Sequence, residues 1–342
     1  MSEKVERTQR ATIRDVAERA GVSISTVSHV FSGGRPISEQ TRKRVRQAAE
    51  ELAYHANPTA QSLRNSTTGI IGLVVRPKDA IRGSLRGTET FSRLMGAIAI
   101  EVLERGLALI HVPDLLDPSA TQVPMDGCIV AHPYGNDPVL NELVSRGIPV
   151  VTVEEDPDHP EFEWSANLSY DNAITQLLSG MKEQGAQRIM LLSGTEDNAW
   201  NRRPAELYKL WAAGNQEHVL HANLYEGEGA SGAARFVASV LDSSTPPDAF
   251  VTGPSTFAAG ALEAFTQRGL STPHNLLLAA LSDSEYTRSA EPPITALDLS
   301  LEALAANAVD LMIRRIAGDE KPGGPSLVHP ELHWRKSTAR FS

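Results

Sequence analysis

The chain has 342 residues, of which 41% are hydrophobic and 5% aromatic, and its formal net charge is −10. This composition indicates a globular protein with room for more than one domain, and the longest apolar runs are far shorter than the roughly 18 residues that span a bilayer. The charged first ten residues do not resemble a secretory signal and the single cysteine, Cys128, excludes an intrachain disulfide, so we expect a soluble, cytoplasmic protein.

The first 66 residues differ in charge from the rest of the chain. They carry eleven lysines and arginines against seven acids, a balance of +4, which leaves −14 for the remainder. A basic segment on an acidic body is typical of a module that binds a polyanion such as nucleic acid. An ordinary solvated surface would give the same numbers, so charge alone leaves both interpretations open.

Three short helices are predicted between residues 12 and 57. Thr12 and Asp15 form a capping-box pattern, and Gly21 can end the first helix. Ser23 and Ser38 can cap the second and third helices. The inner apolar positions are expected to be Val27, Val30 and Phe31 in the second helix and Val45, Ala48, Ala49 and Leu52 in the third. The link of about three residues around Gly21 is typical of a helix-turn-helix.

In a helix-turn-helix unit the second helix enters the major groove of DNA and presents its N-terminal residues to the base edges. Here the outward positions are Ile24, Ser25 and His29, while Ser23, Thr26 and Ser28 would lie near phosphates. His29 could donate to a guanine and Ile24 could contact a thymine methyl group. A three-helix packing unit that binds no nucleic acid remains the alternative from spacing alone.

Residues 12–64 also resemble a known family. The order of three helices, the exit Tyr54, Asn57 and Pro58, and the following Ala60, Ser62 and Leu63 closely resemble the headpiece of the LacI/GalR (lactose-repressor) family of bacterial transcription regulators. The resemblance implies a homodimer, or a higher oligomer, on a pseudo-palindromic double-stranded DNA operator. The candidate DNA-contacting residues are Thr12, Ser23, Ile24, Ser25, Thr26, Ser28, His29, Asn57, Ala60, Leu63 and Arg64.

Residues 58–68 are predicted to form a hinge after a disordered tail (1–11) and the headpiece (12–57). Segment 58–64 is too short for a stable helix in water, so we expect it to be flexible off DNA. On DNA, two copies can pack in the minor groove, where Leu63 would wedge into a base step and Arg64 would lie in the negative potential of the groove. The alternative is that Leu63 packs on the first strand of the core.

From residue 69 to 342, short apolar runs alternate with helical stretches. Fully apolar strands that alternate with helices predict parallel sheets covered on both faces. This region also resembles the core of the same family, which implies two Rossmann-like α/β lobes of the periplasmic-binding-protein type. We expect an N-lobe at about 69–160 plus 300–318 and a C-lobe at about 165–297 plus 325–342. The three crossovers between them are expected near 157–167, 297–300 and 318–328.

A small-molecule effector is expected between the lobes, because ligands of open α/β sheets bind beyond the carboxyl ends of the strands. Ser255 and Ser282 replace polar or acidic residues of the family pattern, which weakens the case for a free sugar, since a polyol needs many hydrogen-bonding partners. An arginine-bearing cleft would suit a carboxylate or phosphate. Alternatively, Trp200 is a packing residue and the nearby arginines are solvated. The candidate effector-binding residues are Asp171, Trp200, Arg202, Ser255, Ser282 and Asp283.

The other motifs in the sequence give little support for catalysis, metal binding or cofactor binding. The glycine pattern at 227–232 follows a weak strand and lacks a well-placed ribose acid, so we do not expect a dinucleotide cofactor. The histidines form no metal-binding motif, Cys128 lies in an apolar strand, and no nucleophile motif is present. We expect no catalytic residue, metal or cofactor.

The sequence therefore predicts a DNA-binding transcriptional regulator, a repressor whose operator affinity is controlled by a small-molecule effector in the core. It would act in the bacterial cytoplasm, at the nucleoid, without a membrane partner. One alternative is a regulator with a vestigial cleft that responds to no small molecule or to a protein partner. Another is a solute-binding receptor with the same core, which the headpiece argues against.

Overall fold

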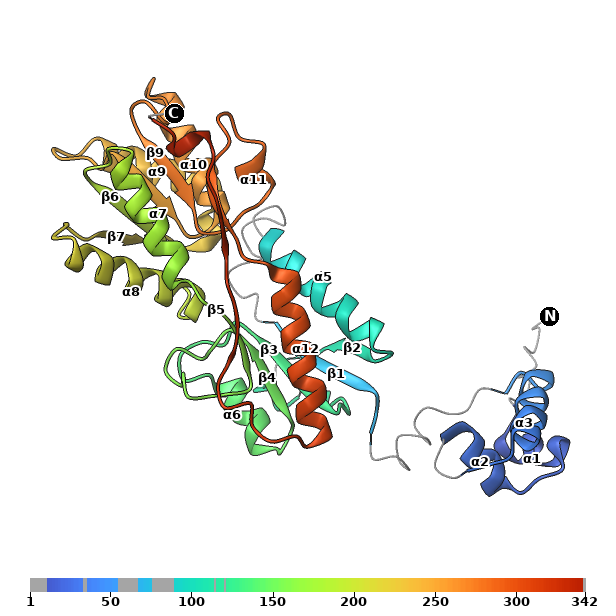
Figure 1. Cartoon of the computed structure of the whole chain (residues 1–342). Helices are drawn as coiled ribbons and strands as arrows, with labels where there is room; N and C mark the ends of the chain where they lie inside the picture. Colours follow the sequence, from blue (N-terminus) through green and yellow to red (C-terminus); the bar gives the residue numbers. More distant parts are fainter. Residues whose placement is uncertain are drawn as a thin grey trace, which may run out of the picture. The chain divides into compact units, whose positions relative to one another are not determined.

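The computed structural model describes residues 11–32, 36–54, 67–75, 89–113, 115–119 and 121–340. The chain divides into two compact units, Met1–Ile70 and Ile71–Ser342 (Figure 1). Across the described ranges, we find no helix with the length and apolar character needed to cross a membrane.

The headpiece has the three predicted helices, α1 (Ile13–Ala20), α2 (Ile24–Ser32) and α3 (Glu39–Glu51). Their beginnings are set by local hydrogen bonds. The backbone N–H of Asp15 donates to the hydroxyl of Thr12 at 3.4 Å, and the N–H of Thr12 donates to the Asp15 carboxylate at 2.7 Å, which completes the predicted capping box. The hydroxyls of Ser23 and Ser38 cap the next two helices at 3.1 and 3.3 Å. Gly21 ends α1 at φ +63°, a conformation that costs glycine little.

A small apolar core joins these helices. Val16 on α1, Val27 on α2 and Val45 on α3 are fully buried and lie in one cluster. The cluster is closed at its edge by Phe31 and Tyr54, whose ring centroids are 6.0 Å apart. The inward faces of all three helices are therefore confirmed.

The second unit contains two six-stranded sheets. The first has the order β11-β5-β4-β3-β1-β2 and the second the order β12-β10-β9-β8-β6-β7. The strands of the first sheet are β1 (Ile70–Val74), β2 (Ala108–His111), β3 (Gly127–Ala131), β4 (Val150–Val153), β5 (Ser165–Leu168) and β11 (Ser326–Val328). Those of the second are β6 (Ile189–Ser193), β7 (Leu220–Asn223), β8 (Ala249–Thr252), β9 (Leu277–Ala280), β10 (Thr295–Asp298) and β12 (Glu331–His333). The strands β3, β4, β8 and β9 are buried along their whole length, as expected for parallel strands covered on both faces.

Each sheet carries its own helices, and the helix α5 lies beside α12 on the first lobe (Figure 1). The helices of the first lobe are α5 (Glu89–Glu104), α6 (Pro138–Ser145) and α12 (Leu301–Ala317). Those of the second are α7 (Asp171–Glu183), α8 (Ala199–Gly214), α9 (Gly229–Leu241), α10 (Ser255–Gln267) and α11 (Glu285–Arg288), with two 3₁₀ turns, η2 (Glu226–Glu228) and η3 (Lys336–Thr338). This is the predicted arrangement of two Rossmann-like lobes.

The first and third crossovers between the lobes lie slightly later in the chain than expected, whereas the second lies within the expected range 297–300. We expected the C-lobe to begin at about residue 165, but β5 pairs in parallel with β4 and with β11, so both β5 and β11 belong to the first sheet. The chain passes between the lobes at 169–170, 299–300 and 329–330. The difference has a physical reason, because β5 holds the polar Ser165 and Asn167 and its sequence lacks the apolar run that marks strands such as β3, β4 and β9.

Residues 112–126, between β2 and β3, contain no helix in their described part. Instead, the loop side chains Val112, Leu115 and Met125 pack against a cluster formed by β1, β3, β4 and α6. Loop side chains thus cover a sheet face that a helix would otherwise bury.

Candidate functional site

The N-terminal turn of α2 presents an exposed polar surface. Ser23, Ile24 and Ser25 are exposed, and the apolar side chain of Ile24 is 43% accessible to solvent. The Ser23 hydroxyl lies 2.7 Å from that of Ser25 and 2.8 Å from that of Thr26. Hydrogen bonds among these hydroxyls fix their positions at the surface, where an external partner can reach them.

Of the other headpiece candidates, Thr12 at the beginning of α1 is exposed, whereas Thr26, Ser28 and His29 are half-buried. The Nδ1 atom of His29 is buried and has no hydrogen-bond partner among the described residues. The remaining predicted DNA contacts, Asn57, Ala60, Leu63 and Arg64, lie outside the described residues.

In the core, a cavity of about 360 Å³ lies between the two lobes. Thr90, Phe91, Ala131, His132 and Tyr134 line it from the first lobe. From the second lobe it is lined by Glu196, Asn198, Trp200, Asn201, Glu226, Glu228, Gly229, Ala230, Ser231, Pro254, Ser255, Thr256, Ser282 and Tyr286. Most of these residues directly follow β3, β6, β8 and β9, so the cavity lies beyond the carboxyl ends of the strands, as is typical of such sheets.

An aromatic pair spans the cavity from one lobe to the other. The rings of His132 and Trp200 meet edge to face, with centroids 5.1 Å apart and planes at 87°. Burial lowers the pKa of His132 to about 4, so its imidazole is neutral at physiological pH. Its Nδ1 atom is buried and has no hydrogen-bond partner within the described part of the chain. His132 thus adds a neutral imidazole ring to the cavity wall.

The charged residues of the described lining, Glu196, Glu226 and Glu228, are all acidic. The Glu226 carboxylate accepts hydrogen bonds from the Thr195 hydroxyl, the Glu196 backbone N–H and the Asn201 side chain, at 3.0, 3.1 and 2.9 Å. Glu228 pairs with Arg235 at 2.5 Å. Among the described lining residues there is no lysine or arginine. The described lining therefore disfavours an anionic ligand and suits a molecule that donates hydrogen bonds.

Three of the six predicted effector residues, Trp200, Ser255 and Ser282, line this cavity. The serines also support their own lobe, because the Ser282 hydroxyl donates to the Gly253 carbonyl at 3.3 Å and accepts from the Ser255 backbone N–H at 3.2 Å. Only part of their hydrogen-bonding capacity remains for a ligand.

The predicted arginine is engaged outside the cavity lining. Arg202 donates to Asp158 of the first lobe at 2.6 Å and to Asp197 at 2.6 Å, and these hydrogen bonds raise its pKa. Asp171 likewise pairs with Arg203 at 2.8 Å. Neither Arg202 nor Asp171 lines the cavity, so the expected arginine-bearing surface for a carboxylate or phosphate is not found in the described lining.

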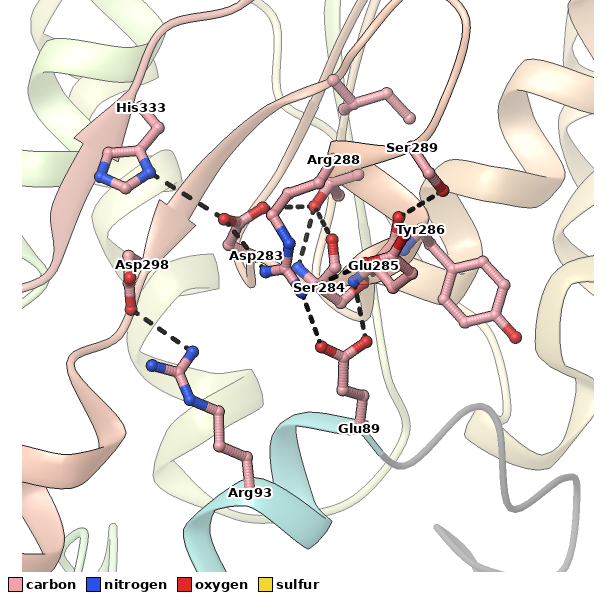
Figure 2. Close-up of polar contacts among 12 residues, drawn as sticks. Glu89, Arg93, Asp283, Ser284, Glu285, Tyr286, Arg288, Ser289, Asp298 and His333 are labelled. Atoms are coloured by element: carbon pink, nitrogen blue, oxygen red, sulfur yellow. Dashed lines mark hydrogen bonds and ion pairs between the residues drawn. The ribbon is translucent and has the colours of Figure 1, made fainter. Parts of the chain in front are cut away.

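Asp283 is a buried anchor of the second lobe. Its side chain is 5% exposed and accepts two hydrogen bonds of 2.8 Å from Arg335, together with one from the Thr287 hydroxyl. Burial alone would raise its pKa, but these hydrogen bonds outweigh it and hold the pKa of Asp283 below its ordinary value. Figure 2 shows Asp283 between His333 and Arg288. Asp283 is not among the residues that line the cavity.

Several lining residues were missed from the sequence, above all His132, Tyr134, Glu196 and Glu226. His132 and Tyr134 follow the apolar strand β3, so their place at a strand end was the available signal. Glu226 directly precedes the glycine pattern at 227–232, and together they form η2 and the beginning of α9. Glu226 and Glu228 at this position would repel a pyrophosphate, which is an argument against a dinucleotide.

A second buried acid lies near a crossover between the lobes. Glu154 follows β4 at φ +68°, is 2% exposed, and accepts the backbone N–H of Leu168 at 3.4 Å. Its Oε1 atom is buried without a hydrogen-bond partner in the described ranges. Burial raises the pKa of Glu154 to about 8, so the folded core holds a protonated carboxyl here at neutral pH.

The remaining candidates for chemistry within the described ranges are metal-binding and nucleophilic groups. No group of three or more potential metal ligands is found among the residues that the structure describes. Cys128 is buried in β3, and burial raises the pKa of its thiol to about 12, which disfavours the reactive thiolate.

Comparisons with known proteins agree with this domain composition. Residues 12–57 match the family model described as bacterial regulatory proteins, lacI family, and residues 179–338 match that of a periplasmic binding protein-like domain. The HTH-type transcriptional repressor PurR of Pasteurella multocida is 26% identical over 341 residues, which cover 96% of this chain and 98% of that protein. PurR of Aliivibrio salmonicida is 27% identical over 345 residues, covering 97% and 100%.

Solved structures share the fold over nearly the whole chain. A Lac repressor dimer bound to operator and the anti-inducer ONPF is similar with a TM-score of 0.79 at 22% identity, covering 96% of this chain and 99% of that one. The complex of the transcriptional regulator CelR with cellobiose is similar with a TM-score of 0.67 at 21% identity, covering 96% and 100%.

A helix-turn-helix headpiece joined to a two-lobed core with a cavity between the lobes defines a ligand-responsive class of bacterial DNA-binding regulators. Within that class, this chain belongs to the LacI family of transcriptional regulators.

Proposed function

We propose that this protein is a repressor that binds a pseudo-palindromic operator as a homodimer in the bacterial cytoplasm. The observation that carries the proposal is the exposed first turn of α2, where Ile24 and the linked hydroxyls of Ser23 and Ser25 face solvent. In this arrangement Ile24 contacts a base edge, and the hydroxyls bind phosphates or bases. The relatives named repressors support the direction of control.

The headpiece proposal is tested by fluorescence anisotropy with a selected operator at several salt concentrations. Ile24→Ala should weaken binding to the operator by about tenfold or more while leaving non-specific binding unchanged, because it removes a base contact and no charge. The matched control is Leu210→Ala, which removes an apolar side chain that is 66% exposed on the core helix α8. Equal operator affinities of Ile24→Ala and the control would overturn the assignment of α2 as the reading helix.

We further propose that a small molecule in the cavity between the lobes controls operator affinity. The ring of Trp200 would pack on a flat face of the ligand, and His132 would accept a hydrogen bond from one of its donor groups. The acidic residues of the lining would favour a neutral or cationic compound over an anionic one. A thermal-shift screen of metabolites on the full chain tests this. An upward shift that is lost in Trp200→Ala supports the assignment, whereas a shift caused only by anionic compounds would contradict it.

A regulator controlled without a small molecule is the second candidate. It is favoured by the cavity's own polar contacts, since the Tyr134 hydroxyl of one lobe donates to Glu196 of the other at 3.2 Å. The same screen separates the two candidates, because a reproducible shift with any class of metabolite excludes this one.

A further inference from the structure

Two groups of polar contacts join the lobes on the sides of the cavity. The first, which we call the loop latch, consists of residues 134, 135 and 158 of the first lobe and 196–198 and 202 of the second. The second, the helix latch, consists of Glu89 on α5 and of Glu285 and Arg288 on α11. Both latches adjoin cavity-lining residues of both lobes.

The loop latch contains backbone and side-chain contacts. Tyr134 and Asn198 form an isolated antiparallel bridge, and the N–H of Gly135 donates to the carbonyl of Asp197 at 2.9 Å. Arg202 then pairs with Asp158 across the lobes at 2.6 Å. Because Arg202 is also bonded to Asp197 within its own lobe, the guanidinium is already oriented toward Asp158.

The packing at Gly135 shows how closely the lobes meet. A Cβ atom at Gly135 would lie 2.5 Å from the Asp158 carboxylate and 2.8 Å from the Arg202 guanidinium. A methyl group at this position would therefore displace the side chains of the cross-lobe ion pair.

The helix latch centres on one carboxylate (Figure 2). Glu89 accepts the backbone N–H of Glu285 at 2.8 Å and a hydrogen bond from Arg288 at 3.0 Å. Arg288 also contacts the buried Asp283 at 3.5 Å, and Asp283 is fixed by Arg335. The second lobe thus presents a prearranged surface to Glu89, so that little side-chain freedom is lost when the lobes meet.

The lobes are joined covalently at 169–170, 299–300 and 329–330. A rotation about these crossovers that opens the cavity must separate residues on different lobes. Glu89 would leave Arg288 and Asp158 would leave Arg202, whereas ion pairs within one lobe would be unaffected.

We propose that the loop latch and the helix latch hold the core closed through contacts of the chain with itself. A cavity ligand would then regulate the protein by strengthening or breaking these contacts, an extension that rests on the proposed function. Exposed ion pairs shift such an equilibrium by about two- to fivefold each. Pairs that are far apart act nearly independently, so losing one contact from each latch should shift it by roughly tenfold.

The test measures the distance between the lobes in ligand-free, full-length protein. Nitroxide labels are attached at Asn141→Cys on α6 and Leu210→Cys on α8, both exposed, while the buried thiol of Cys128 stays unlabelled. Labelled chains are diluted with unlabelled protein so that pulsed electron resonance reports distances within one chain. The double variant Glu89→Gln/Asp158→Asn removes one charge from each latch without changing side-chain size.

We expect the double variant to increase the population at long distances by roughly tenfold over the parent. Gly135→Ala changes no charge and should shift the distribution in the same direction. The matched control is Asp242→Asn, which breaks the 2.8 Å pair with Arg268 inside the second lobe and should leave the distances unchanged.

If both latch variants keep the distance distribution of the parent and of Asp242→Asn, the proposal is overturned. Circular dichroism of each variant checks that it is folded. The distances are measured without ligand or DNA, so this result is independent of the operator and ligand assays. If the latch variants do not change the distances, the proposed function is unaffected. If no ligand controls operator binding, the proposal of the two latches is unaffected.

Discussion

The headpiece and the cavity use polar side chains in different ways. At the beginning of α2, the hydroxyls of Ser23, Ser25 and Thr26 bond to neighbours within three residues of the chain, and Ser23 and Ser25 are exposed. Around the cavity, the partners of Asp158 and Glu89 lie 44 and 199 residues away, on the opposite lobe. Local bonding leaves the headpiece surface available to an external partner, whereas the long-range bonds couple the movement of two lobes.

The largest expected effect comes from deleting the headpiece, which separates DNA binding from ligand binding in the core. A chain lacking residues 1–56 loses all of α1, α2 and α3, so we expect operator affinity to fall by at least about a thousandfold. Its thermal shift with a cavity ligand should persist, because the cavity lies wholly in the second unit. Gel-shift titration measures the first effect. Operator binding that survives the deletion would contradict the assignment of DNA recognition to the headpiece.

The second prediction concerns the stability of the core. The pKa of Glu154 is raised to about 8 in the folded protein from 4.5 in the unfolded chain, so between these pH values the folded state holds a proton that the unfolded state has lost. The free energy of unfolding should therefore decrease as pH rises from about 5 to 8, by up to roughly 1.4 kcal/mol per pH unit from this group.

The variant Glu154→Gln keeps the size of the side chain and removes its titration. Urea unfolding of the core at pH 5 and pH 8 should show a smaller loss of stability in the variant than in the parent. The headpiece transition should not change, because Glu154 belongs to the second unit. Identical pH dependence of parent and variant would show that the buried carboxyl does not hold its proton.

The third prediction concerns the segment between the two regions. We expect Leu63→Ala to weaken operator binding by roughly tenfold or more and to reduce DNA bending, because an apolar wedge stabilises the unstacked base step. Bending is measured by energy transfer between dyes at the two ends of the operator, with the core melting temperature as a check on folding. Unchanged bending would rule out the wedge and favour packing of Leu63 on the core.

The smallest effect is confined to the headpiece. Ser38 caps α3 by accepting the backbone N–H of Thr41, so Ser38→Ala should destabilise the headpiece by about 1 kcal/mol. For a unit of this size the melting temperature falls by about 4–8 °C, while that of the core stays the same. Calorimetry of the full chain measures both transitions. A change in the core transition would show that the two units do not unfold independently.

Elements that are set by contacts between near neighbours in the chain were predicted well from the sequence, and elements that depend on distant residues were not. The helices of the headpiece were predicted down to their capping residues. The capping contacts of Thr12 with Asp15, and the helix end at Gly21, depend only on residues within one or two helical turns. The apolar strands of the core were equally clear. The short, polar β5 was missed, because its position depends on pairing with β4 and β11 rather than on its own pattern.

The position of the cavity in the fold was predicted from the sequence, but only some of its lining residues were. Trp200, Ser255 and Ser282 follow strands and line it. Arg202 and Asp283 also follow strands, yet their charges are satisfied by Asp158, Asp197 and Arg335. Which charged side chain finds a partner is decided by tertiary contacts, so the sequence alone could not separate ligand-binding groups from structural ion pairs.

Selection of bound fragments from a random DNA library tests the central claim most directly, with the full chain and the chain lacking residues 1–56 used side by side. The account predicts that the full chain enriches an inverted repeat and that the truncated chain enriches nothing. Enrichment of no common sequence by the full chain, or of the same sequence by both, would contradict it.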